Sequence, residues 1–239
     1  MMMGDMPELM EIILNNLNNE FYSLYSCALV SRHWCKMTIP IIWQNPFSFD
    51  QNPLFISQYF SSFDENEKFG LEKYGINVNF ADTLFNYAGF LKVLNSYNLE
   101  CTVQKWLDFQ LADSSSKYPI INLLFNFFVK SGATLEQFAI YYTECEISLE
   151  VFDLLEKNEL FFSQLQDLSF NLLQMSDFKA ECLIALFTFL TKTTTKIKVL
   201  KIEEFCYIHE PRLFHALECF IKSQEQLRQF SLISGENIL

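Results

Sequence analysis

An apolar motif recurs four times in the second half of the chain, and it limits the possible folds more strongly than any other feature. Each copy has an apolar residue, two variable residues, a second apolar residue, one variable residue and a third apolar residue. The copies start at Leu135, Leu165, Ile197 and Leu227, at spacings of 30, 32 and 30 residues. The alternation at the end of each copy predicts a short strand with one buried face. Such a unit cannot bury its apolar face alone, so neighbouring units must stack.

The segments between these motifs have the apolar spacing and the starting residues of helices. We expect helices over residues 120–130, 149–162, 177–192 and 211–224. Strands that are separated by long helical crossovers pair in parallel. The sequence therefore predicts an α/β fold in which helix–strand units build a short solenoid with parallel strands. The alternative is a generic α/β domain in which the motif spacing arises by chance.

The part of the chain before residue 119 shows no comparable repeat. Apolar stripes predict amphipathic helices over residues 55–63, 83–94 and 101–111, and a polar loop follows over 112–117. We divide the chain into three parts on this basis. They are an N-terminal helical module over residues 1–48, a mainly helical connecting region over 49–118 and the solenoid over 119–239.

The N-terminal stretch 6–43 carries more large apolar side chains than it can bury by itself. Pro7 suits the first turn of a helix, and apolar residues such as Leu9 and Ile13 follow at the spacing of one helical face. After a polar break, a second apolar stretch runs from Leu24 to Ile41. Three short helices of about forty residues cannot form a sufficient core. The module therefore needs a partner, which is either the rest of the chain or another protein.

This stretch resembles an F-box. The matching elements are Pro7-Glu8-Leu9, the pair Ile12-Ile13, Leu17, the run Ala28-Leu29-Val30-Ser31-Arg32, Trp34 and the pair Ile42-Trp43. Met6 replaces the Leu that the family usually has, and a longer polar insert over 18–23 separates the first two helices. The resemblance implies that the module docks on the Skp adaptor of a cullin ubiquitin ligase. The docking residues that it implies are Pro7, Leu9, Ile13, Leu17, Val30 and Trp34.

The repeated units look like the irregular leucine-rich repeats that follow F-boxes, which implies that they capture a protein substrate. They are longer than ordinary repeats, and no polar ladder follows the strands at Thr143, Leu173, Phe205 and Gly235. We expect the core-facing pairs to be Phe138/Ile140, Leu168/Phe170, Leu200/Ile202 and Phe230/Leu232. The alternate residues then form a mostly neutral outward strip. The candidate substrate-binding residues on it are Ala139, Tyr141, Ser169, Asn171 and Lys201, with Tyr141 as the main anchor.

Charge and cysteine content narrow the possible partners and location. The chain has 17 Lys and Arg residues against 29 Asp and Glu residues, a formal net charge of −12. This charge repels nucleic acid and anionic membrane surfaces, so we expect neither as a partner. No apolar run approaches the roughly 18 residues of a membrane span, and the first residues do not form a secretory signal. Seven cysteines without a CxxC motif suit a reducing compartment, so we expect the protein in the cytoplasm, the nucleus or both.

Catalytic motifs are absent from the sequence: it has no P-loop, no GxSxG and no HExxH. One cluster could suit tetrahedral zinc, namely Cys206, His209, His215 and Cys219. The two cysteines have apolar neighbours, however, and a buried thiol packs well among them, so we expect no metal, no cofactor and no catalytic residue. The sequence predicts a substrate adaptor of a ubiquitin ligase rather than an enzyme. The alternatives are a solenoid scaffold without a ubiquitin role and a zinc-dependent enzyme.

Overall fold

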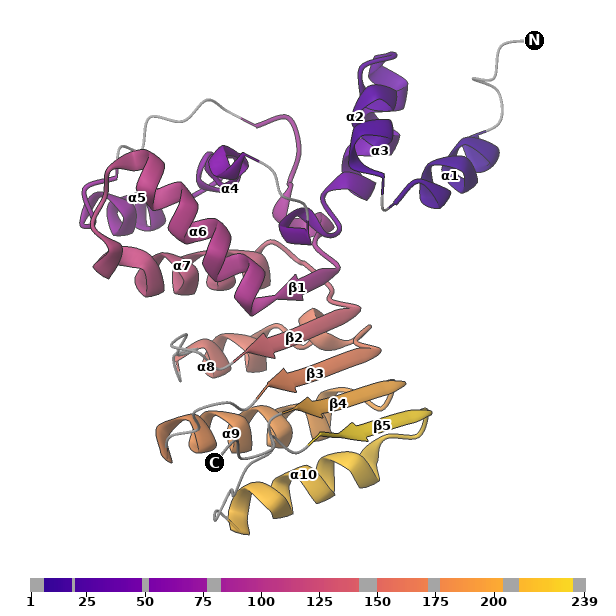
Figure 1. Ribbon diagram of the computed structural model, residues 1–239, viewed down its shortest axis with the longest axis vertical. Coiled ribbons are helices and arrows are strands. Elements are labelled where there is room, and N and C mark those ends of the chain that lie inside the picture. The colour runs from indigo at the N-terminus through magenta and orange to yellow at the C-terminus, as the bar shows by residue number, and fades with distance from the viewer. Residues whose placement is uncertain are drawn as a thin grey trace, which may run out of the picture.

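The computed structural model describes residues 7–18, 20–48, 52–76, 83–141, 150–171, 177–203 and 211–233. It shows N-terminal helices followed by alternating helix–strand units that form one five-stranded parallel sheet (Figure 1). The strands lie in the order β1-β2-β3-β4-β5, which is their order along the chain. The predicted α/β class and the parallel pairing are therefore confirmed.

Three helices form the N-terminal part: α1 (Pro7–Asn16), α2 (Phe21–Ala28) and α3 (Arg32–Ile42). The side chain of Ser31 caps α3 by accepting a hydrogen bond from the backbone N–H of Trp34 at 3.3 Å. This cap starts α3 directly after α2, and the two helices pack side by side (Figure 1). Helix α1 contacts α3 and contributes the buried side chain of Leu14 to the core.

The connecting region is helical with one short strand. Its elements are η2 (Pro46–Ser48), η3 (Pro53–Phe55), α4 (Ile56–Phe60), α5 (Glu65–Glu72), η4 (Ala88–Phe90), β1 (Val93–Asn95), α6 (Ser96–Gln110), η5 (Ser114–Ser116) and α7 (Lys117–Lys130). The helix predicted over 83–94 is wrong, because this segment ends in β1. The backbone N–H groups of Lys92 and Val93 both donate to the carbonyl of Gln44, which draws the chain into the sheet. Asn95 then caps α6.

The repeated units follow the connecting region. Their elements are β2 (Gln137–Tyr141), α8 (Glu150–Lys157), η6 (Glu159–Phe162), β3 (Asp167–Asn171), α9 (Asp177–Thr193), β4 (Val199–Glu203), α10 (Pro211–Ser223) and β5 (Gln229–Leu232). All four strands predicted from the motif are present. Helices α8, α9 and α10 lie on one face of the sheet (Figure 1), and we call the other face the open sheet face.

Two columns of apolar side chains run across the sheet toward these helices. The pairing aligns Phe138 with Leu168 and Leu168 with Leu200, and all three are buried. The column of Ile140, Phe170 and Ile202 is buried in the same way. The prediction that Phe230 and Leu232 are also buried is wrong, because 48% of Phe230 and 51% of Leu232 is exposed. They continue the two columns in register at the last strand, where no further unit in the described chain covers them.

A backbone ladder joins the units at the point where each strand begins. One carbonyl of each unit accepts hydrogen bonds from two successive N–H groups of the next unit, at 2.7 to 3.1 Å. The carbonyls belong to Gln44, Lys92, Glu136, Gln166 and Lys198. The first of them follows α3 directly, so the ladder ties the N-terminal helices to the sheet. The loop positions at which the sequence showed no polar ladder lie outside the described residues.

Aromatic packing reinforces the same junction. Trp43 lies at the end of α3, with ring centroids 5.1 Å from Tyr59 and 4.2 Å from Tyr87. Tyr59 in turn lies 5.0 Å from Phe128 of α7. These side chains belong to one continuous buried core that extends from α1 to α10. No helix in the described part of the chain is long and apolar enough to cross a membrane.

Candidate functional site

Five large aliphatic side chains of the N-terminal helices are exposed, in addition to Tyr22 and Tyr25 of α2. They are Leu9, Ile12 and Ile13 on α1 and Leu29 and Val30 after α2, and we call them the N-terminal apolar surface. Their exposed fractions range from 39% for Ile13 to 71% for Leu29. Leu9, Ile12 and Ile13 are neighbours on α1, and Leu29 and Val30 form a second exposed group at the α2–α3 turn. Exposed apolar patches often mark interaction sites.

The packing of α1 explains why this surface is left over. Met10 and Leu14 lie four residues apart on α1, and both are buried. Side chains at this spacing share one helical face, so the helix has a single inward stripe. Leu9, Ile12 and Ile13 lie outside that stripe. The helix therefore has more apolar surface than the rest of the described chain covers.

The predicted docking residues divide into two groups in the structure. Leu9, Ile13 and Val30 belong to the N-terminal apolar surface. Leu17 and Trp34 are half-buried and pack against the core, which gives them a structural role as well. Pro7 starts α1, and its side chain lies outside the described residues. Sequence reasoning left Ile12 and Leu29 out of the docking set, although both are part of the matching motif.

The open sheet face carries the predicted substrate-binding residues. The register aligns Ala139, Ser169 and Lys201 across β2, β3 and β4, and it aligns Tyr141 with Asn171. A shallow groove of about 210 Å³ lies over β1 to β4, and the small side chains of Ala139 and Ser169 are part of its lining. Asp167 and Lys201 line it, so the groove contains one charge of each sign. Three of the five predicted residues, Ala139, Ser169 and Lys201, line this groove. Tyr141 and Asn171 lie next to each other on β2 and β3 but do not line it.

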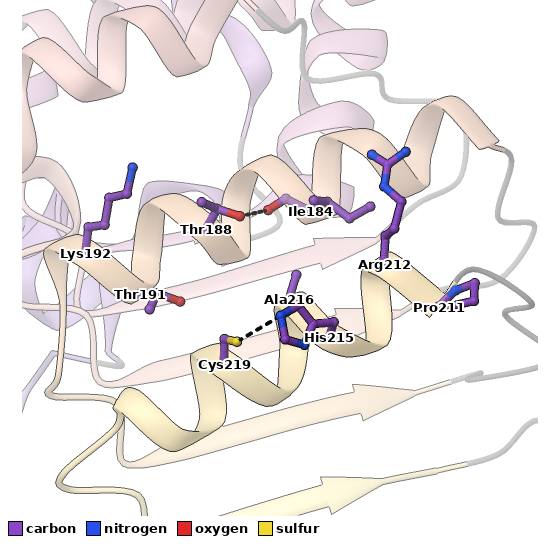
Figure 2. Close-up of a pocket in the computed structure, with 9 residues that line it drawn as sticks. All are labelled: Ile184, Thr188, Thr191, Lys192, Pro211, Arg212, His215, Ala216 and Cys219. Carbon is purple, nitrogen blue, oxygen red and sulfur yellow. Dashed lines mark hydrogen bonds between the residues drawn. The ribbon is translucent and has the colours of Figure 1, made fainter.

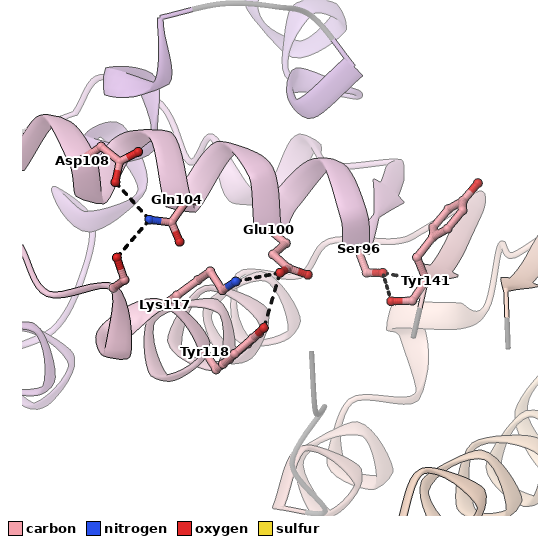
Figure 3. A network of polar contacts seen from close by, with 8 residues as sticks. Ser96, Glu100, Gln104, Asp108, Lys117, Tyr118 and Tyr141 are labelled. Carbon is pink, nitrogen blue, oxygen red and sulfur yellow. Dashed lines mark hydrogen bonds and ion pairs between the residues drawn. The ribbon is translucent and has the colours of Figure 1, made fainter. Parts of the chain in front are cut away.

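A polar network fixes the position of Tyr141 (Figure 3). The hydroxyl of Ser96, at the start of α6, accepts a hydrogen bond from the backbone N–H of Tyr141 at 2.8 Å. One turn further along α6, Glu100 pairs with Lys117 at 2.8 Å. Burial lowers the pKa of Lys117, but the hydrogen bond and charge of Glu100 outweigh this effect and raise the pKa above its usual value. Ser96 therefore ties the backbone of Tyr141 to the start of α6, and the Glu100–Lys117 pair separately joins α6 to α7.

A second groove lies between α9 and α10 and has a volume of about 650 Å³ (Figure 2). Ile184 and Thr188 of α9 line it, together with His215 and Cys219 of α10. The sulfur of Cys219 lies 3.7 Å from Nε2 of His215, so these two members of the proposed zinc set are in contact. Cys206 and His209 lie outside the described residues, and the four-ligand set stays untested. The residues that the structure does describe contain no cluster of three possible metal ligands.

Comparisons of the chain with protein-family models, with curated proteins and with solved structures found no significant match.

Proposed function

We propose that the protein is a substrate adaptor of a Skp–cullin–F-box ubiquitin ligase. The N-terminal helices dock on the Skp subunit, which connects the chain to the cullin, and the helix–strand array binds a protein substrate. The N-terminal stretch resembles an F-box in the order of its motif elements. The repeated units resemble leucine-rich repeats in their strand motif and in their one-sided packing.

The observation that carries this proposal is the N-terminal apolar surface. A scaffold whose first helices only close the end of the array would bury their apolar side chains against it. Instead, 71% of Leu29 and 64% of Val30 is exposed, while α1 buries only its inward stripe of Met10 and Leu14. The same segment matches a motif that docks on another protein. Apolar anchors of this size dominate the energy of protein–protein interfaces when they become fully buried.

The junction between the two parts suits the proposed mechanism. An adaptor acts by proximity, because it raises the effective concentration of substrate lysines near the ligase. This effect depends on a defined distance between the docking surface and the substrate surface. The Gln44 carbonyl and the ring of Trp43 connect the N-terminal helices to the sheet without a flexible linker. Substrate would bind the open sheet face at Ala139, Tyr141, Ser169, Asn171 and Lys201.

A binding titration with purified Skp adaptor tests the docking step. Leu29→Asp places a charge in the proposed interface, and we expect it to cost about 2 kcal/mol or more, which is about thirtyfold weaker binding. Leu160→Asp is the matched control, because Leu160 is also 71% exposed but lies in η6 of the array. Circular dichroism verifies that both variants fold. Equal affinity of the two variants for the adaptor would remove the basis for the proposal.

A further inference from the structure

The last strand, β5, has one paired edge and one free edge. The N–H of Gln229 donates to Lys198 and that of Ile233 to Ile202, so these peptide groups face β4. Successive peptide groups along a strand point to opposite edges. The N–H and C=O groups of Phe230 and Leu232 therefore point away from β4, where no strand of the described chain pairs with them.

The start of β1, at the opposite edge of the sheet, is bonded to another segment of the chain. There the carbonyl of Gln44 accepts hydrogen bonds from Lys92 and Val93 at the start of β1. Natural sheets usually protect a free edge with charged residues, Pro or a bulge. The sequence of β5 is Gln-Phe-Ser-Leu, which contains none of the protective residues. Its two apolar side chains, Phe230 and Leu232, are half-exposed on the helix-covered face.

We propose that β5 pairs antiparallel with β5 of a second copy of this chain, around a two-fold axis that passes through Ser231. Phe230 then lies opposite Leu232 of the second copy, and Leu232 opposite its Phe230. In an antiparallel pair these residues exchange both N–H···O bonds, so all four free groups of each copy are satisfied. The five-stranded sheet becomes a continuous sheet across both copies.

The occupant is a second copy because the edge is complementary to itself. Phe230 and Leu232 flank Ser231 on either side. A two-fold rotation therefore places each apolar side chain opposite an apolar side chain of the second copy, and each free N–H opposite a free C=O. A two-fold axis perpendicular to the sheet also keeps α10 of both copies on the same face. The two columns of buried side chains, which end at Phe230 and Leu232, then continue into the second copy. The chains repel each other with a net charge of −12 each, but none of this charge lies on β5.

Disulfide crosslinking tests the predicted register. In this register, Ser231 lies opposite Ser231 of the second copy, and the two form a non-hydrogen-bonded pair with Cα atoms about 4.5 Å apart. Disulfides span Cα distances in this range. The matched control is Gln229→Cys, which points to the same face. Its partner cysteine would lie about 13 Å away along the strand direction, four residues out of register. We expect Ser231→Cys to form a crosslinked dimer about tenfold faster than Gln229→Cys or the unmodified chain under mild oxidation with copper phenanthroline and oxygen.

Sedimentation equilibrium provides the second measurement. The mass of the unmodified chain should rise with concentration from 28.1 kDa toward twice that value. Salt should strengthen the association, because it screens the repulsion between two acidic chains. Phe230→Glu should remain monomeric, whereas Leu29→Asp on the N-terminal apolar surface should crosslink through Ser231→Cys as before.

Three outcomes overturn the proposal. They are an unmodified chain that stays monomeric at its highest soluble concentration, a dimer that survives Phe230→Glu, and equal crosslinking rates for Ser231→Cys and Gln229→Cys. If the chain stays monomeric and β5 instead pairs with a strand of another protein, the proposal is also overturned. None of these results depends on Skp binding, so this proposal and the proposed function fail separately.

Discussion

The N-terminal helices and the helix–strand array are both rich in apolar residues, but they use them differently. In the array, Leu168 and Phe170 are each 1% exposed, because their strand β3 lies between β2 and β4 and its inward face is covered by helices. On α1, three of the large apolar side chains remain exposed. The inner strands of the array bury their apolar side chains when the chain folds, whereas the N-terminal helices and the last strand, β5, retain apolar surface that a partner could bury.

The difference follows from the number of neighbours that each element has. Strand β3 pairs with β2 and β4 and contributes both of its inward residues to the core. Helix α1 has a single inward stripe, and no other element of the described chain covers its outer side. Apolar composition alone therefore does not distinguish a core from a docking surface, since the number of covering layers decides it.

The largest expected effect contrasts one leucine from each region. Leu168→Ala creates a cavity in a buried column and should lower the free energy of unfolding by about 3 kcal/mol. Leu29→Ala removes a side chain that is 71% exposed, and it should change stability by about 0.5 kcal/mol or less. Urea denaturation of the two variants gives both values. Equal losses of stability would show that Leu29 is part of the core.

A smaller effect is expected at Gln224, the buried amide that joins the last two units. Its Oε1 accepts a hydrogen bond from the N–H of Ile197 at 3.2 Å, and its Nε2 donates to the carbonyl of Thr194 at 3.0 Å. Gln224→Ala leaves both backbone groups unsatisfied and should cost about 2 kcal/mol. Gln226→Ala, at an exposed position of the same turn, is the control and should be nearly neutral. Thermal unfolding of both variants measures the difference. Equal melting temperatures for Gln224→Ala and Gln226→Ala would contradict the role of Gln224 in joining the last two units.

The smallest expected effect concerns Tyr59, which lies at the junction of the two regions. Its hydroxyl is buried and has no hydrogen-bond partner among the described residues, and burial raises its pKa well above the ordinary value of 10.0. Removal of the unsatisfied hydroxyl by Tyr59→Phe should stabilise the protein by about 1 kcal/mol at neutral pH.

The raised pKa of Tyr59 also fixes the sign of a pH effect. Below pH 10 the phenol is neutral in both the folded and the unfolded states, so its protonation does not change the stability of the protein with pH. Above pH 10 the unfolded state loses the proton first, so stability falls with rising pH. Tyr59→Phe should therefore lose less stability than the unmodified chain between neutral pH and pH 11. An equal loss of stability in Tyr59→Phe and the unmodified chain over this pH range would contradict the assignment.

The repeat was sufficient to predict four of the five strands and the buried faces of three of them, because alternation over several residues is a local signal. Strand β1 was missed. It has three residues, and Leu84, Ala88 and Leu91 upstream occur at helical spacing. A contact distant in sequence decides the conformation there, since the Gln44 carbonyl binds the N–H groups of Lys92 and Val93.

The exposure of Phe230 and Leu232 could not be predicted from their pattern. Alternation identifies the face on which a side chain lies, but it does not show whether another layer covers that face. The same limit applies to the candidate site. The motif indicated Leu9, Ile13 and Val30 as docking residues, but only the packing of α1 and α2 shows that Ile12 and Leu29 are exposed with them.

Hydrogen exchange of the chain with and without purified Skp adaptor tests the central claim most directly, because it compares the two regions in one experiment. The account predicts that binding slows exchange of backbone amides in α1 and at the α2–α3 turn around Leu29 and Val30. The amides of β2, β3 and β4 should exchange at unchanged rates. Unchanged exchange throughout the N-terminal helices at saturating adaptor, or protection confined to the sheet, would contradict the claim that the N-terminal apolar surface is the docking site.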